Sequence, residues 1–298
     1  MPDDSTTVVL ADPNVSTETI PVPEAKRPKF GVFFWVCSGW LGFLAFITIF
    51  ASLLPFQNPN NPDYVAGTDA GITGTHWLGT DDLGRDILAR FVYGARVSLI
   101  IGLLATAIGI SIGGFLGMLS AYRRGRLDGA LSMLMYTGLA FPAIVAVLAV
   151  LSFWGRAEWH IIIVLGLFSV PLIFRLVRSA TLACATKEYI TAAKSQGAKS
   201  LRVLSHDIFP NIAPSLIAYT VFTMGGVIAT EGALAFLGYS VLPPTSSWGT
   251  MINEASTLDP NNIYLLLAPA LGLFFTLICL NYMGERIRVH FDSGEAKL

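Results

Sequence analysis

The sequence predicts an all-α, polytopic membrane protein with six transmembrane helices. Its 298 residues are 53% hydrophobic and only 13% charged, whereas a soluble domain carries about 25% charged residues. The apolar residues gather into six stretches, each roughly 17 to 25 residues long, which is the length a helix needs to cross a hydrocarbon layer about 30 Å thick. Those stretches contain only two charged side chains, Arg175 and Glu231.

Each expected span follows one apolar stretch. The spans are 33–54, 97–121, 130–154, 161–177, 215–237 and 264–284. Around them the chain divides into a tail 1–30, a first helical segment 31–55, a loop 56–96, a five-helix core 97–292 with a long loop 179–214, and a tail 293–298. The first tail is acidic, whereas a cleaved signal peptide begins with a short basic region that runs into its apolar core. We therefore expect a disordered tail and an uncleaved first span.

The positions of Lys and Arg predict the orientation. Six spans put both termini on one side of the membrane, and that side carries fifteen of the 19 Lys and Arg residues. Loops rich in these residues stay in the cytoplasm. Both termini are therefore expected to be cytoplasmic, with loop 56–96 outside and loop 179–214 inside.

The small residue counts exclude several functions. Three cysteines cannot form a secretory disulfide framework, and the four histidines share no short metal-ligand spacing, so no metal site is expected. A net charge of -1 offers no basic surface for nucleic acid. The phosphate-binding pattern GxxxxGK[ST] is absent from the sequence. If ATP drives this protein, another chain must bind it.

Glycines and prolines punctuate the spans. Gly109, Gly113 and Gly117 recur every four residues and predict close packing of the second span against another helix. Pro142, Pro171 and Pro269 each lie within a span, where the missing N–H predicts a kink. Kinked helices suit a pathway that alternates in access.

The outer loop ends in a pattern typical of a helix start. Leu83, Ile87 and Phe91 have helical spacing, and Asp81 or Asp82 is available to cap the first turn. We expect an interfacial helix that leads into the second span.

The inner loop 179–214 predicts two short helices. Glu188 favours a helix start, and Gly197 supplies a C-terminal stop. The residues between them share a face at helical spacing: Tyr189, Ala192, Ala193 and Gln196. This pattern fits an ordinary amphipathic connector, which the residues alone favour, or a compact knob that another protein receives in a groove.

The second short helix of the inner loop is expected after residue 199. Ser200 can cap it, and an apolar stripe follows, formed by Leu201, Leu204 and Ile208. Pro210 and Pro214 are expected to end this helix before the fifth span.

This inner segment resembles the EAA loop of ABC-importer permeases. Ala192, Ala193, Gly197 and Pro210 hold the motif positions, whereas Thr191, Asp207 and Phe209 depart from it. The acid at Glu188 matches the variant of the peptide-importer branch. The resemblance implies a coupling helix seated on an ATPase subunit, formed by Glu188, Tyr189, Ala192, Ala193, Gly197, Ala198, Leu201 and Pro210.

The outer loop resembles the C-type permease subunit of oligopeptide, dipeptide, nickel and glutathione importers. The pattern H-x-L-G-T-D-x-x-G-R-D rests on His76, Gly79, Asp81, Gly84, Arg85 and Asp86. Segments 231–251 and 281–292 agree, so the similarity covers about 30–292. Met133 and Tyr136 replace a charged pair of the family, which puts in doubt an ionic contact at the start of the third span.

The resemblance implies a type I ABC-importer permease fold in the bacterial inner membrane. The expected cargo is oligopeptides or dipeptides, with nickel or glutathione as the alternative. The implied partners are a homologous B-type permease, two ATPase subunits that bind MgATP, and an extracytoplasmic peptide-binding protein. This chain itself is expected to hold no cofactor and no catalytic residue.

Three sites keep alternatives. Glu231 is the only acid in a span, so it either forms part of the translocation pathway or a gate, or makes a structural hydrogen bond. It is also the only residue that would support a secondary transporter. For Asp81, Asp82, Arg85 and Asp86 we favour a salt-bridged cap over a substrate or metal site, with a role in receiving the binding protein or in meeting the partner permease left open. Trp248 and Gly249 are expected to form a turn with an interfacial anchor, with a docking surface as the alternative.

Overall fold

The computed structural model describes residues 30–54, 56, 58–257 and 263–295; the predicted disordered tail 1–30, apart from residue 30, and the last residues 296–298 lie outside this range. The described residues are helical apart from loops and one isolated β-bridge between Thr80 and Asp86. The α-helices are α1 (Val32–Ile49), α2 (Ile87–Gly109), α3 (Phe115–Arg123), α4 (Gly125–Ala140), α5 (Ala143–Trp154), α6 (Glu158–Ala185), α7 (Glu188–Ser195), α8 (Ser200–Arg202), α9 (Phe209–Phe236), α10 (Trp248–Thr257) and α11 (Ile263–Glu295). Two π-helical turns, η1 (Ile110–Gly114) and η2 (Val203–Ile208), join α2 to α3 and α8 to α9.

Five of the described helices are long and apolar enough to cross a membrane, and a sixth crossing requires α4 and α5 together. The five are α1, the continuous helix α2–η1–α3, α6, the continuous helix α8–η2–α9, and α11. The pair α4 and α5 is bent by 88°. The six predicted spans thus correspond to five straight crossings and one broken helix.

The break between α4 and α5 has a local cause. Pro142 lacks an N–H, and it forces the residue before it out of the helical region. Phe141 accordingly has extended backbone, with φ -81° and ψ 139°. The kink expected here is a full break, whereas Pro171 and Pro269 lie inside continuous helices.

Two helix boundaries differ from the predictions. No separate interfacial helix precedes the second span, because α2 begins at Ile87 and continues directly into the crossing. Its cap is Asp86, whose carboxylate accepts from the N–H of Leu88 at 2.8 Å, so the prediction of Asp81 or Asp82 as the cap was wrong. In the last element, α11 runs to Glu295, into the segment predicted as a tail.

The predicted end of the second short helix at Pro210 and Pro214 was also wrong. The chain stays helical from Ser200 to Phe236. Pro210 is the second residue of α9 and lies just after the π-helical turn η2, where the regular helical hydrogen-bond pattern is already interrupted. Lys199 occupies the N-cap position of α8 without a side-chain hydrogen bond, so Ser200 does not cap this helix.

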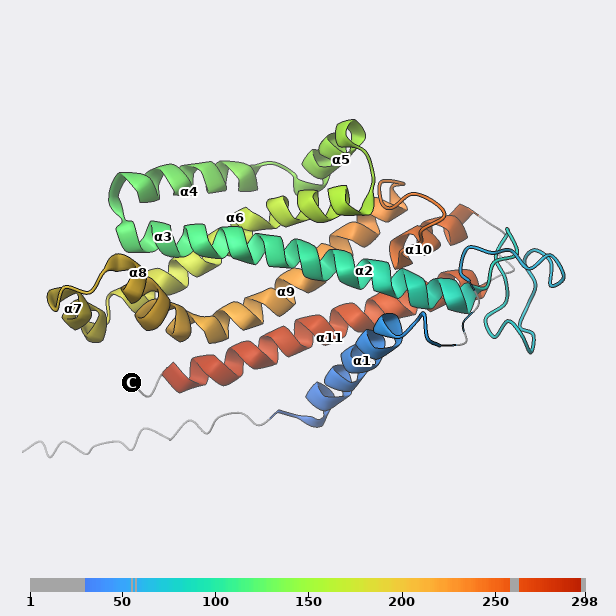
Figure 1. Cartoon of the computed structure of the whole chain (residues 1–298), viewed down its shortest axis with the longest axis horizontal. Helices are drawn as coiled ribbons and strands as arrows, with labels where there is room; N and C mark the ends of the chain where they lie inside the picture. The colour runs from blue at the N-terminus through green and yellow to red at the C-terminus, as the bar shows by residue number, and fades with distance from the viewer. Residues whose placement is uncertain (1–29, 55, 57, 258–262, 296–298) are drawn as a thin grey trace, which may run out of the picture.

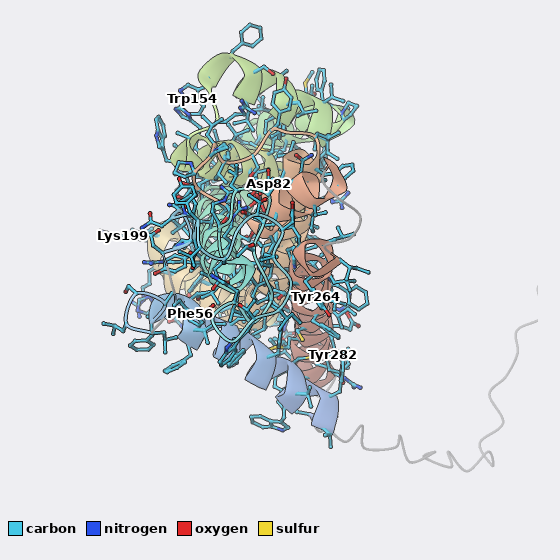
Figure 2. The ribbon with its side chains drawn as sticks, turned by 90° about the vertical axis from the view of Figure 1, so that its right-hand side faces the viewer. Phe56, Asp82, Trp154, Lys199, Tyr264 and Tyr282 are labelled. Carbon is cyan, nitrogen blue, oxygen red and sulfur yellow. The ribbon has the colours of Figure 1, made fainter. Side chains whose placement is uncertain are left out.

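The long helices run side by side, with loops gathered at two opposite ends (Figure 1). One end carries α7 and α8, and the other carries α10 and the loop before α2. Phe30 stacks on His290 with ring centroids 4.7 Å apart, so the start of α1 lies beside the last turns of α11. Viewed along the bundle, α1 and the pair α4 and α5, marked by Trp154, occupy opposite edges (Figure 2).

Close packing of the second crossing against α6 confirms the prediction from its glycines. A Cβ atom on Gly109 would lie 1.9 Å from the Ser169 hydroxyl, and one on Gly117 would lie 2.8 Å from the Phe174 carbonyl oxygen. Only glycine permits this approach. At the start of the third span, α4 is tied to α6 by an ion pair between Asp128 and Arg178 at 2.6 Å.

Candidate functional site

The loop before α2 is shaped by glycines in the left-handed region. Gly79 has φ +82°, and a Cβ atom there would lie 2.4 Å from the Ala70 carbonyl oxygen. Gly84 has φ +75°, and a Cβ atom on it would lie 3.3 Å from the Asp63 carbonyl oxygen. Neither position accommodates another residue without strain. These two motif glycines therefore serve the shape of the loop.

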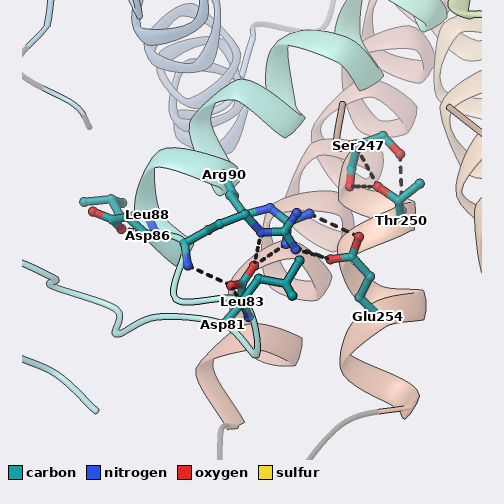
Figure 3. Close-up of polar contacts among 9 residues, drawn as sticks. Asp81, Leu83, Asp86, Leu88, Arg90, Ser247, Thr250 and Glu254 are labelled. Atoms are coloured by element: carbon teal, nitrogen blue, oxygen red, sulfur yellow. Dashed lines mark hydrogen bonds and ion pairs between the residues drawn. The ribbon is translucent and has the colours of Figure 1, made fainter. Parts of the chain in front are cut away.

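Asp81 organises this loop from a fully buried position. One carboxylate oxygen accepts from the backbone N–H groups of Leu83 (3.0 Å) and Arg85 (2.8 Å). The other accepts from the Arg85 side chain at 2.7 Å and from Arg90 at 2.5 Å (Figure 3). A buried carboxylate with four donors closes the turn and joins it to α2.

Arg90 extends the network to α10. Its guanidinium is 1% exposed and donates to both carboxylate oxygens of Glu254, at 2.7 and 3.1 Å (Figure 3). Arg85 lies 3.7 Å from the same carboxylate. Two guanidinium groups thus neutralise two carboxylates, Asp81 and Glu254, which offsets the cost of burying them. We call these four residues the outer clasp.

Sequence reasoning missed half of the outer clasp. Arg90 falls at helical spacing with apolar neighbours, and its burial beside acids was not foreseen. Glu254 lies 164 residues further along the chain. No local pattern connects these positions, so the pairing could not be derived from spacing.

His76 ties the start of the loop to the start of α2. The ring is fully buried, with Nε2 3.2 Å from Asp63 and Nδ1 3.5 Å from Asp86. The N–H of Val65, together with His76, lowers the pKa of Asp63. In the described residues, no group of three or more His, Cys, Asp and Glu side chains could hold a metal ion. The six motif residues of the outer loop therefore lie together: His76, Asp81, Arg85 and Asp86 make its ionic contacts, and the two glycines form its turns.

Glu231 is held by three hydroxyl groups. It is fully buried, and its carboxylate accepts from Ser240 at 2.6 Å, Ser247 at 2.7 Å and Ser98 at 3.3 Å. These serines come from α2 and from the segment between α9 and α10. This geometry is that of the structural alternative; a part for Glu231 in the pathway or a gate stays a prediction.

Trp248 is not the interfacial anchor that the sequence suggested. It is fully buried at the start of α10, stacks on Phe91 at 5.4 Å between ring centroids, and donates its indole N–H to the Phe91 carbonyl oxygen at 3.0 Å. The serine hydroxyls and this ring lock α10 onto α2. The outer clasp therefore lies on a firmly packed base.

The inner end carries the predicted coupling segment as a separate helix, α7. Glu188 begins it, and Gly197 follows it with φ +79°, as expected of a C-terminal stop. Ile190 is fully buried and packs in a core cluster with Val203 and Ile208. This buried anchor, which sequence reasoning missed, leaves the opposite face of α7 outside the core.

The exposed face of α7, opposite Ile190, carries residues that the sequence predicted for coupling to an ATPase. Glu188, Tyr189, Ala192 and Gly197 are exposed, and Ala193 and Ala198 are half-buried. Beside them lies a hollow of about 410 Å³ lined by Ala193, Gln196, Gly197, Ala198, Lys199, Arg202 and Asp207. Leu201 is 74% exposed, and it lines an apolar hollow together with Leu204, its neighbour in the predicted stripe. Pro210 lies further along, in the first turn of α9.

The bundle carries an exposed helix of small residues at one end and a salt-bridged loop at the other, and a comparison with known families accounts for this arrangement. Residues 109–296 match the family described as binding-protein-dependent transport system inner membrane component. The chain belongs to this family. It is thus the membrane-spanning permease subunit of an ABC importer, as the sequence resemblance had predicted.

Curated relatives agree with this assignment. The permease is 33% identical to the glutathione transport system permease protein GsiD of Pectobacterium atrosepticum, over 80% of this chain and 79% of the relative. It is 34% identical to GsiD of Escherichia coli O157:H7, over 84% and 82% of the two chains. The dipeptide transport system permease protein DppC of Alkalihalophilus pseudofirmus is 32% identical, over 83% and 81%.

Proposed function

We propose that this permease imports short peptides, either dipeptides and oligopeptides or glutathione, as the C-type subunit of a heteromeric complex. The relatives named for glutathione and for dipeptides support this cargo, because both substrates share peptide backbone chemistry. A homologous B-type permease completes the pathway, and an extracytoplasmic binding protein delivers the peptide. Two ATPase subunits hold MgATP, while this chain contributes no cofactor and no catalytic residue.

The observation that carries the proposal is the exposed face of α7 above its buried anchor. Ile190 fixes the helix to the core that contains η2, which continues into the α9 crossing. A push on Ala192 or Tyr189 would therefore move the crossing as a rigid body. ATP binding would close the ATPases, draw the coupling helices together and open the permeases outward, and hydrolysis would reset them.

Transport assays test this function. Proteoliposomes that contain both permeases, the ATPases and the binding protein should accumulate labelled dipeptide or glutathione only when MgATP is present on the ATPase side. Nickel serves as the alternative cargo in a parallel assay. Uptake of nickel alone would contradict the peptide assignment, and uptake driven by an ion gradient without ATP would contradict the ATP-driven mechanism.

Thiol labelling tests the orientation, with both termini in the cytoplasm. Val65 is 97% exposed on the outer loop, and Ser200 is exposed beside α7. We expect an impermeant thiol reagent to modify Val65→Cys in intact spheroplasts and Ser200→Cys only after lysis. The opposite pattern would invert the topology.

A further inference from the structure

A hollow of about 360 Å³ lies between α9, α6 and the broken pair α4 and α5. Leu139 and Ala143 line it from either side of the break, so the bend opens this space. Most of its lining is apolar, and none of the described residues that line it is charged. Glu231 is not among them.

One face of α9 supplies most of the polar lining. Tyr219, Thr223, Gly226 and Thr230 line the hollow and follow one another at intervals of four, three and four residues. Such spacing places them on one side of a helix with 3.6 residues per turn. We call this face the α9 hydroxyl stripe. Glu231 directly follows Thr230, so it lies about 100° around the helix axis from that residue and outside the stripe.

Thr223, like Tyr219, differs from Thr230 and Ser169, the other hydroxyl residues that line the hollow. It is 8% exposed and makes no side-chain hydrogen bond with any described residue. Thr230 donates to the Gly226 carbonyl oxygen at 2.8 Å, and Ser169 across the hollow donates to the Gly166 carbonyl oxygen at 2.7 Å. The Thr223 oxygen is not among the fully buried side-chain atoms and faces the hollow, and a hydroxyl without a protein partner takes one from another source. In a membrane crossing, that source is water or a polar solute in the hollow.

We propose that the α9 hydroxyl stripe is this subunit's wall of the translocation pathway, and that Thr223 hydrogen-bonds the backbone amide groups of a peptide in transit. The inference rests on the proposed function and names the surface that performs it. Uncharged hydroxyls beside apolar side chains bind a peptide weakly and irrespective of its side-chain charge, as passage requires. The pathway face is therefore distinct from the face that carries Glu231.

Cysteine accessibility tests the location of the pathway. In the full complex, with Cys37, Cys184 and Cys279 replaced by serine, Thr223→Cys is compared with Thr220→Cys. Thr220 lies on the same helix, outside the hollow, and donates to the Leu216 carbonyl oxygen at 2.8 Å. Labelling by an impermeant thiol reagent is measured without nucleotide and with the ATPases trapped on nucleotide. We expect position 223 to react about tenfold faster than position 220 in at least one state, with dipeptide slowing the reaction. Equal rates in both states would overturn the proposal.

A conservative series tests the hydrogen bond itself. Thr223→Val keeps the shape and removes the hydroxyl, and we expect it to raise the KM for dipeptide uptake by up to about tenfold, the effect of one lost hydrogen bond. Thr223→Ser should restore the wild-type KM, and Thr220→Val should leave it unchanged. An unchanged KM in Thr223→Val would contradict the proposed hydrogen bond between Thr223 and the peptide. If the wild-type complex takes up no peptide, the proposed function fails; if it does and position 223 is unreactive, only the pathway assignment fails.

Discussion

At the scale of the residue, the outer loop depends on paired charges that are largely buried. Asp81 and Arg90 are almost completely buried and satisfy each other together with Glu254. Breaking such a pair on one side leaves a buried charge uncompensated, which costs more than the pair contributes when intact. The acidic motif residues thus owe their importance to folding of the loop.

Removal of one carboxylate tests this account of the outer clasp. Glu254→Gln leaves Arg90 with a single ionic partner, and we expect a loss of about 1–3 kcal/mol in stability, seen as a lower Tm in detergent. Glu158→Gln, a change of the same chemistry in the first turn of α6, should shift the Tm little. Equal shifts for both variants would show that the ion pair contributes nothing.

Asp82 provides a pH-dependent prediction. Desolvation, followed by repulsion from Asp81, raises the pKa of Asp82 above its usual value. The folded state therefore holds the proton more tightly than the unfolded state, so stability is lost as pH rises through the folded pKa. Asp82→Asn should raise the Tm at pH 7 relative to wild type, and the difference should shrink on acidification. A constant difference across pH would contradict the assigned cause.

At the scale of the element, local signals predicted both ends of α7, whereas they predicted none of the distant pairings. Glu188 and Gly197 bound α7 as expected, since a dipole preference and a left-handed stop act within one turn. Three acids precede α2, and only the tertiary structure decides that Asp81 enters the outer clasp while Asp86 caps. The prediction that Pro210 ends a helix failed because α8, η2 and α9 form one continuous helix across it, with the π-helical turn just before the proline.

Gly197 is the element-scale test of coupling. Gly197→Asp places a charge in the face proposed to contact the ATPase, and we expect peptide-stimulated ATPase activity to fall roughly tenfold or more, because burying an unpaired charge costs several kcal/mol. Gly125→Asp is the matched control: it also has positive φ and open space around it, in the turn between α3 and α4. Comparable loss in both variants would point to backbone strain rather than docking.

At the scale of the whole molecule, the number of crossings and the shared end of the termini follow from composition and charge. The bend of 88° between α4 and α5, and the hollow beside it, do not. A proline in an apolar run predicts a kink, but its angle depends on packing against α6 and α9. The α9 hydroxyl stripe was likewise overlooked, because a few hydroxyls in an apolar run give little signal compared with one acid such as Glu231.

Two native thiols test the packing of the first crossing on the last. Cys37 in α1 and Cys279 in α11 are buried and contact each other. Mild oxidation with copper phenanthroline should join them, so that protease cleavage in the outer loop leaves the two fragments linked until reduction. Cys37→Ser should abolish the link, and Cys184→Ser should not. A link that survives in Cys37→Ser would contradict this helix pairing.

The distance along the chain between Arg90 and Glu254, 164 residues, bears on the order of synthesis. The outer loop and the second crossing leave the ribosome long before α10 has been synthesised. Until then the Arg90 guanidinium lacks the acid that later binds both of its terminal nitrogens. We therefore expect the outer loop to reach its final shape only once α10 has been made and has packed beside it, and we expect a nascent chain halted earlier to present this loop in a more protease-sensitive form.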